Sequence, residues 1–214
     1  MMSSALAYTQ LRQNTPASVR VIAVSKKQTV AEIESVYAAG CLDFAENYLQ
    51  EALPKIRQIQ HPDLRWHFIG HLQSNKLKEI AAHFDVVQSI DRLELASKLN
   101  AICEKLNKIM PIFIQVNLDH EPQKSGVLPP DLPAVLLAIK NMTHLDLEGL
   151  MLIPAIGNAA AFSGLRALRE RMLLQTGMRL PRLSMGMSRD YPLAIAEGAT
   201  DVRIGEAIFG SRLN

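Results

Sequence analysis

Lys26 is the residue of this sequence that is best placed to do covalent chemistry. It directly follows a short apolar run, residues 21–25, whose composition is typical of a β-strand. A lysine amine forms a Schiff base with an aldehyde, and an arginine and a glycine-rich turn can bind the ring and phosphate groups of such a ligand. The last strand-like run, residues 201–205, supplies Arg203 and Gly205. These residue types predict a cradle for an aldehyde that carries a phosphate, if the fold brings the two runs together.

The elements that must position these residues alternate along the chain. We predict strands at residues 19–25, 43–47, 66–70, 84–89, 111–117, 145–153, 183–187 and 201–205. Helical patterns lie between most of them, at residues 29–39, 48–58, 74–82, 92–108, 131–140 and 159–175. Thr29 and Glu32 have the spacing of a capping box that begins the first of these helices, and Gly40 is suited to end it.

This alternation predicts a parallel sheet that helices cover on both faces, because the strands are apolar on both sides. The units follow one another without a linker, a low-complexity segment or a break in composition. We therefore predict one α/β domain over residues 1–214, a single (β/α)8 TIM barrel, although 214 residues is near the short end for this fold. A doubly wound open sheet is the alternative.

A closed barrel gives Lys26 and Arg203 a common location. The last strand of a barrel lies beside the first, so both residues reach the carboxyl-end face, where the active sites of barrel enzymes lie. Alternation places Lys26 on the same side of its strand as residues 22 and 24, and Arg203 on the same side as residues 201 and 205. Both sets can point into the barrel. Lys27 is expected on the opposite side, as an exposed charge.

The predicted phosphate site lies between the loops that follow the last two strands, the customary position in this fold. Here these loops contain residues 185–188 and 205–207, with Gly186, Ser188 and Gly205. Glycine lets backbone N–H groups approach a phosphate, and the Ser188 hydroxyl can donate a hydrogen bond to it.

Composition argues against several classes of partner. The chain has 23 Lys and Arg residues against 21 Asp and Glu residues, and they are scattered, so neither nucleic acid nor a membrane surface is expected as a partner. The longest apolar stretches, residues 132–139 and 147–156, are shorter than the roughly 20 residues that cross a bilayer, and the first residues do not resemble a secretion signal. Cys41 and Cys103 are too few for a disulfide framework. We expect a soluble, cytoplasmic monomer with a small-molecule ligand.

Several segments, in order along the chain, resemble the pyridoxal phosphate homeostasis family, also called the YggS or PROSC family, a single-domain relative of the alanine racemase N-terminal barrel. The most specific is Trp66-His67-Phe68-Ile69-Gly70, which Gln73-Ser74-Asn75-Lys76 follows. The others are residues 23–26, 44–48, 124–126, 148–151, 184–188 and 202–210.

This resemblance implies roles for five residues and a cofactor, pyridoxal 5′-phosphate (PLP). Lys26 would hold PLP as a Schiff base, and Arg203 would face the pyridine nitrogen. Ser188 and the backbone around Gly205 would hold the phosphate, and Asn47 would lie beside the cofactor. The resemblance also implies a protein of vitamin B6 homeostasis that binds PLP without established turnover and supplies, buffers or delivers it, with PLP-dependent apoenzymes as candidate recipients.

Two features favour binding over catalysis. A permanently charged arginine at the pyridine nitrogen disfavours protonation of that nitrogen, which weakens the ring as an electron sink. The sequence ends at Asn214, soon after the predicted phosphate turn, whereas the related amino-acid racemases, by resemblance, carry a further domain. The alternative is a PLP-dependent amino-acid racemase or related enzyme, with His71 or Tyr48 as a proton carrier. A third hypothesis is that the loaded barrel signals to another protein.

Simpler roles are open for two of the site residues. Arg203 could be an ion-pair partner of Asp201 or Glu206. Asn47 could cap the helix that follows it.

Two segments depart from the family pattern. Residues 151–155 carry Leu and Ile where the family commonly has a small residue, which could alter one wall of the pocket. Tyr191 and Pro192 are unusual because proline fixes the backbone where the next helix should begin. His67 and His71 do not have the helical geometry of a metal pair, and we expect His67 to be a hydrogen-bonded strand residue.

Overall fold

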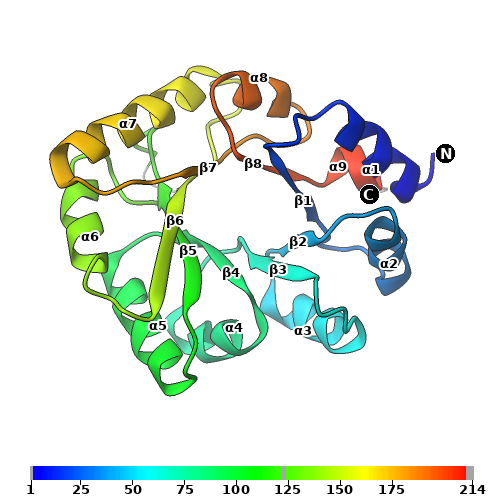
Figure 1. The fold of residues 1–214 in the computed structure, drawn as a ribbon, viewed down its shortest axis with the longest axis horizontal. Helices are drawn as coiled ribbons and strands as arrows, with labels where there is room; N and C mark the ends of the chain where they lie inside the picture. Colours follow the sequence, from blue (N-terminus) through cyan, green and yellow to red (C-terminus); the bar gives the residue numbers. More distant parts are fainter. Residues whose placement is uncertain (1, 122–123, 211–214) are drawn as a thin grey trace.

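Eight parallel strands close into a barrel in the computed structural model, which describes residues 2–121 and 124–210. Figure 1 looks into the ring of strands, with the helices outside it. The strands are β1 Arg20–Val24, β2 Asp43–Glu46, β3 Arg65–Phe68, β4 Val86–Ile90, β5 Met110–Val116, β6 Leu145–Leu152, β7 Arg182–Ser184 and β8 Asp201–Ile204. Each of them overlaps a predicted strand. The predicted (β/α)8 barrel is confirmed, and the open-sheet alternative is wrong.

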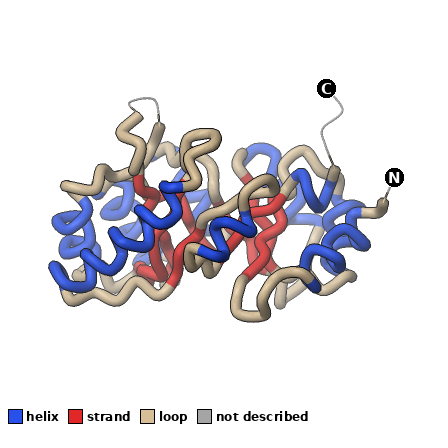
Figure 2. Tube along the Cα trace, turned by 90° about the horizontal axis from the view of Figure 1, so that it is seen from above, coloured by secondary structure: helices blue, strands red, loops and turns tan. Residues whose placement is uncertain are grey.

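The helices lie around the barrel, and Figure 2 shows them on both sides of the strands. They are α1 Ser4–Gln13, α2 Val30–Ala38, α3 Leu49–Gln58, α4 Leu77–His83 after the 3-10 turn η1 Ser74–Lys76, α5 Leu93–Lys105, α6 Leu132–Ile139, α7 Ala160–Thr176, α8 Tyr191–Ala196 and α9 Glu206–Phe209. Helices α1, α8 and α9 were not predicted from sequence. The last two have only six and four residues, which is too few to show the helical repeat of apolar residues.

Local sequence signals explain where individual helices begin and end. The Thr29 side chain accepts a hydrogen bond from the Glu32 amide at 3.3 Å and caps α2, as the capping box predicts. Gly40, just beyond the helix, has φ +96°, a conformation that glycine adopts without strain. Pro192 lies in the first turn of α8, where the missing N–H is tolerated, so the departure at Tyr191 and Pro192 does not prevent a helix.

The main hydrophobic core lies between the barrel and its helices. Aromatic side chains pack there: the rings of Phe68 on β3 and of Phe84, the residue after α4, meet edge to face at 5.2 Å. Two smaller apolar clusters form apart from it, one of Ile22, Val24 and Ala45, and another of Val86, Phe113 and Met151. Strand alternation directs both clusters into the barrel.

Charged side chains close the amino-terminal end of the barrel. The carboxylate of Asp201, which is fully buried, lies 2.7 Å from Arg182 Nη2 and 3.5 Å from Arg20 Nε. Each of these residues is the first of its strand, so they meet at the end of the barrel opposite the carboxyl ends of the strands. Asp201 therefore neutralises arginines at the closed end of the barrel.

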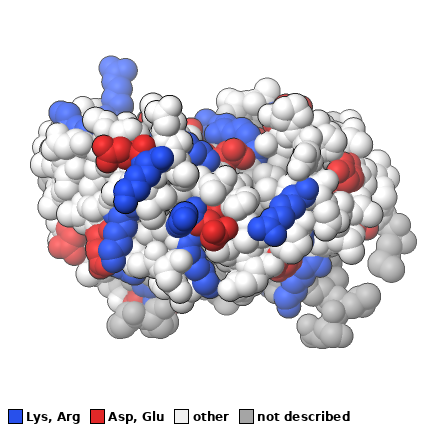
Figure 3. All heavy atoms as spheres, turned by 90° about the horizontal axis from the view of Figure 1, so that it is seen from below, with Lys and Arg blue, Asp and Glu red and all other residues white. Residues whose placement is uncertain are grey.

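The surface gives little sign of a charged partner. On the face that Figure 3 shows, basic side chains lie apart from one another, with acidic side chains between several of them. Within residues 2–121 and 124–210, no helix is long and apolar enough to span a membrane.

Candidate functional site

A cavity of about 650 Å³ opens at the carboxyl ends of the strands. Its lining includes every residue that the sequence predicted for the site: Lys26, Asn47, Ser188, Arg203 and Gly205. These residues come from the segments after β1, β2 and β7, from β8, and from the turn after β8. The closure of β1 against β8, with Ile22 opposite Arg203, brings the two ends of the sequence together.

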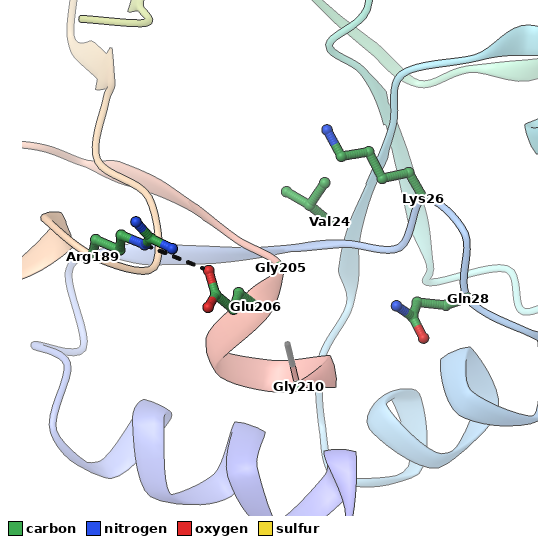
Figure 4. A pocket seen from close by; sticks show the side chains of 7 residues that line it. All are labelled: Val24, Lys26, Gln28, Arg189, Gly205, Glu206 and Gly210. Atoms are coloured by element: carbon green, nitrogen blue, oxygen red, sulfur yellow. Dashed lines mark ion pairs between the residues drawn. The ribbon is translucent and has the colours of Figure 1, made fainter. Parts of the chain in front are cut away.

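Lys26 lies two residues beyond the end of β1 and is partly buried. Figure 4 shows its side chain in the opening of a smaller adjoining cavity of about 440 Å³, with the ion pair of Arg189 and Glu206 on the opposite side. Lys27 is exposed, as expected, but strand alternation is not the reason. The strand has ended at Val24, and Lys27 turns away with φ +64°.

Arg203 is almost completely buried, with only 3% of its surface exposed. It donates hydrogen bonds from Nη1 to Ser184 Oγ at 2.7 Å and from Nη2 to the Leu152 carbonyl oxygen at 2.8 Å. The alternative of an ion pair is wrong, because Asp201 pairs with arginines at the other end of the barrel and Glu206 pairs with Arg189. Desolvation lowers the pKa of Arg203 to about 10, so the guanidinium is still charged at neutral pH.

A chain of hydrogen bonds continues from Arg203 through the barrel interior. The Ser184 hydroxyl donates to Gln88 Oε1 at 2.7 Å, and Gln88 Nε2 lies 3.0 Å from His67 Nδ1. His67 Nε2 lies 2.9 Å from Asp43 Oδ1. Since the Gln88 amide oxygen accepts from Ser184, its nitrogen donates to His67 Nδ1, and His67 Nε2 donates to the Asp43 carboxylate. His67 is thus the hydrogen-bonded strand residue that the sequence predicted.

Asn47 faces the cavity and does not cap the next helix. The N-cap of α3 is Tyr48, and no side chain makes a capping hydrogen bond there, so the capping alternative is wrong. Asn47 Oδ1 is buried and has no hydrogen-bond partner among the described residues. A buried acceptor of this kind normally has a partner. Gly70 packs against the same residue so tightly that a Cβ on it would lie 1.8 Å from the Asn47 carbonyl oxygen.

The predicted phosphate loops lie next to each other. Gly186 has φ +93°, and a Cβ there would lie 2.6 Å from the Ala194 Cβ, so the turn after β7 requires glycine. This turn places Ser188 so that its Oγ accepts a hydrogen bond from the Ala207 amide of α9 at 3.1 Å. Gly205 lies in the same part of the cavity wall. The Ser188 hydroxyl therefore lies in the cavity wall beside the first turn of α9.

Residues 153–159 form an apolar wall of the cavity, in the region where the sequence departs from the family pattern. Asp119, which sequence reasoning missed, anchors this wall: it accepts hydrogen bonds from the Ala155 amide at 2.6 Å and from Asn158 Nδ2 at 2.8 Å. Desolvation acts to raise the pKa of Asp119, but these hydrogen bonds and Lys124 outweigh it, so the pKa lies below its ordinary value.

Gln88 and Ser184 were also missed by sequence reasoning. Each is a fully buried polar residue of a strand, Gln88 after two valines in β4 and Ser184 after Leu183 in β7, and a polar residue next to apolar strand residues is the signal that could have identified them. His71 and Tyr48, the proton carriers of the racemase alternative, are not among the described residues that line the cavity. In the described part of the chain no group of three or more His, Cys, Asp or Glu side chains could hold a metal ion.

Comparison with known proteins assigns the family. A family model described as the alanine racemase N-terminal domain matches residues 7–213. The pyridoxal phosphate homeostasis protein of Pseudomonas aeruginosa is 47% identical over 199 residues, which are 92% of this chain and 86% of that protein. The chain belongs to the pyridoxal phosphate homeostasis protein family. Another member, from Synechocystis, is 41% identical over 218 residues, 99% of this chain and all of that protein.

Solved structures agree with this assignment. PipY of Synechococcus elongatus, whose structure was solved with PLP bound, has a TM-score of 0.92 and 40% identity, and the match covers 97% of this chain and 100% of PipY. Alanine racemase of Clostridium difficile has a TM-score of 0.81 but only 13% identity, and this chain covers 60% of it. The homeostasis family therefore shares the barrel of the racemases, and the low identity supports a likeness of fold alone.

Proposed function

We propose that this protein binds PLP in the cavity at the carboxyl ends of its strands, as a Schiff base on Lys26, and acts in the homeostasis of this cofactor. The observation that carries the proposal is the convergence of Lys26 with the buried, charged Arg203 in one cavity, from opposite ends of the sequence. The family of the chain supports it, as does PipY, which was solved with PLP bound.

The residues of the cavity fit this cofactor. Arg203 uses two of its donor atoms within the barrel and also lines the cavity, so its remaining N–H groups can reach a ring nitrogen there. The unpartnered Oδ1 of Asn47 is an acceptor for a donor group on a ligand. Ser188 and the backbone at Gly205 can hold the phosphate.

Lys26 would supply the amine for the covalent step of binding. A Schiff base there would need only its unprotonated ε-amino group and the release of the aldehyde oxygen as water, without any oxidant or reductant. When bound, PLP supplies an electrophilic carbon and a ring that can accept electrons. Arg203 remains charged and so opposes protonation of the ring nitrogen, which favours retention over turnover of amino acids.

The carrier function is preferred to the racemase alternative. The proton carriers that the alternative requires, His71 and Tyr48, do not line the described cavity, and the His71 side chain is 59% exposed. We further propose that the protein works as a monomeric, single-domain carrier in the cytoplasm, with PLP-dependent apoenzymes as recipients.

A spectral titration tests the proposal. Adding PLP to the purified protein should produce the absorbance band of a protonated imine, and borohydride should fix the cofactor on the peptide that contains Lys26. Lys27→Ala, one residue away and exposed, is the matched control and should keep the band. An unchanged band in Lys26→Ala, or a label on another lysine, would refute the assignment. Exchange of the α-proton of amino acids in deuterated water would show that the racemase alternative is correct.

A further inference from the structure

The backbone on both sides of Lys26 is held by two side chains of helix α3. Lys55 Nζ donates a hydrogen bond to the Ser25 carbonyl oxygen at 2.9 Å, and Glu51 Oε1 accepts one from the Lys27 amide. The Ser25 carbonyl belongs to the peptide unit before Lys26, and the Lys27 amide belongs to the unit after it. Both peptide units that flank the Lys26 Cα are therefore anchored from one helix.

Glu51 and Lys55 belong to a charged cluster that is largely buried. Lys55 Nζ lies 2.6 Å from Glu51 Oε1 and 2.9 Å from Glu46 Oε1, and the Ser25 hydroxyl donates to Glu46 Oε1 at 2.7 Å. Lys55 and Glu46 are buried, and Glu51 is partly buried. Desolvation makes buried ion pairs a weak source of stability, whereas hydrogen bonds within them can fix geometry, and Lys55 here donates to three acceptors, Ser25, Glu46 and Glu51. The cluster lies beside Lys26 but does not line the cavity, which indicates that it fixes the position of the backbone around Lys26.

Backbone strain gives an independent indication at the same place. Lys27 has φ +64°, the left-handed region that residues other than glycine rarely adopt. Such strain persists only where surrounding contacts hold it, and it concentrates at functional sites. Two hydrogen bonds hold it here: the Gln28 amide donates to the Ser25 carbonyl oxygen at 3.0 Å and closes the turn, and the Lys27 amide donates to Glu51.

We propose that Glu51 and Lys55 are positioning residues for Lys26, which keep its backbone in the strained turn and so present its amine to an aldehyde in the cavity. This inference rests on the proposed Schiff base with PLP. Neither residue touches the ligand: they act by limiting the orientations of Lys26. Preorganisation of a nucleophile accelerates bond formation, and small displacements of it are costly.

The test compares two substitutions of Glu51. Glu51→Met removes the acceptor for the Lys27 amide but leaves Lys55 paired with Glu46, so the protein should still fold. Glu51→Gln keeps a carbonyl oxygen for that amide. Glu94→Met is the matched control, because Glu94 forms an i,i+4 ion pair with Lys98 on α5 that is exposed. The measurements are the rate of imine formation with PLP and, in protein without PLP, the hydrogen exchange of the Lys27 amide.

Glu51→Met should slow imine formation by about tenfold or more and speed exchange of the Lys27 amide, while Glu51→Gln and Glu94→Met stay near the wild-type rates. Adding Lys27→Gly to Glu51→Met should recover much of the rate, because glycine adopts the left-handed turn without help. A wild-type rate in Glu51→Met, or no recovery with Lys27→Gly, would overturn the inference. If the wild-type protein forms no imine at all, the proposed function fails, and the exchange of the Lys27 amide still reports whether Glu51 holds the turn.

Discussion

The hydrogen-bond chain behind Arg203 makes a quantitative prediction for Gln88, which is fully buried at its centre. Gln88→Met keeps the length and shape of the side chain but removes both the acceptor for Ser184 and the donor for His67. The Ser184 hydroxyl hydrogen and His67 Nδ1, both buried, then each lose the hydrogen bond that Gln88 makes, while Ser184 Oγ still accepts from Arg203 and His67 Nε2 still donates to Asp43. Since each loss costs about 1–2 kcal/mol, the free energy of unfolding should fall by about 2–4 kcal/mol.

Urea unfolding, followed through the fluorescence of the buried Trp66, measures this loss. Gln115→Met on the neighbouring strand is the graded control: among the described residues the Gln115 side chain makes one hydrogen bond, to the Ser125 carbonyl oxygen at 2.8 Å, so its loss should be smaller, about 1 kcal/mol. The double variant Gln88→Met with Ser184→Ala should lose at least about 1 kcal/mol less than the sum of the single variants. Additive losses, or a loss below about 1 kcal/mol for Gln88→Met, would show that these residues do not act as one chain.

Three further predictions concern the surroundings of the cavity. Gly70→Ala places a Cβ against the Asn47 carbonyl oxygen and should cost at least about 2 kcal/mol in urea unfolding, whereas Gly164→Ala on α7, whose Cβ would make only a 3.6 Å contact with a side chain, should be neutral or stabilising. Asp119 has a lowered pKa in the folded protein, so its contribution to stability is present above its ordinary pKa, about 3.9, and is lost as pH falls through the lower folded value. Asp119→Asn should therefore flatten the dependence of stability on pH below about 4, and an unchanged acid profile would contradict this. Desolvation raises the pKa of the Cys41 thiol to about 12, so thiol reagents at pH 8 should label it slowly until the protein is unfolded in urea, and rapid labelling of the native protein would contradict the burial.

The alternation of strands and helices is largely a local property, and the sequence predicted it well. Strand composition and helical periodicity act within a few residues, so each predicted strand overlaps an observed one. Two of the three missed helices, α8 and α9, are short, with six and four residues, whereas the third, α1, has ten. Barrel closure followed from counting the units and from the rule that such strands pair in order.

The same distinction between local and long-range information applies to the site. The sequence alone predicted Lys26, Arg203 and the loops around Ser188 as site residues, from residue types at strand ends and a family resemblance, and the structure brings them to one cavity. It could not identify the support behind them: Ser184 and Gln88 are 96 residues apart and meet only across the barrel interior. Periodicity tells which way a side chain points, but not which partner it finds there.

What the sequence by itself determined is the alternation of elements and the place of a lysine just beyond the first strand, at the carboxyl-end face of the barrel. What only the tertiary structure decided is how that lysine is held and why Arg203 stays charged inside the barrel. Lys55 on α3 donates a hydrogen bond to the Ser25 carbonyl oxygen. Arg203 donates hydrogen bonds to Ser184 Oγ and to the Leu152 carbonyl oxygen rather than to a carboxylate. Both arrangements depend on burial and on contacts between distant segments, which exist only once the barrel has closed.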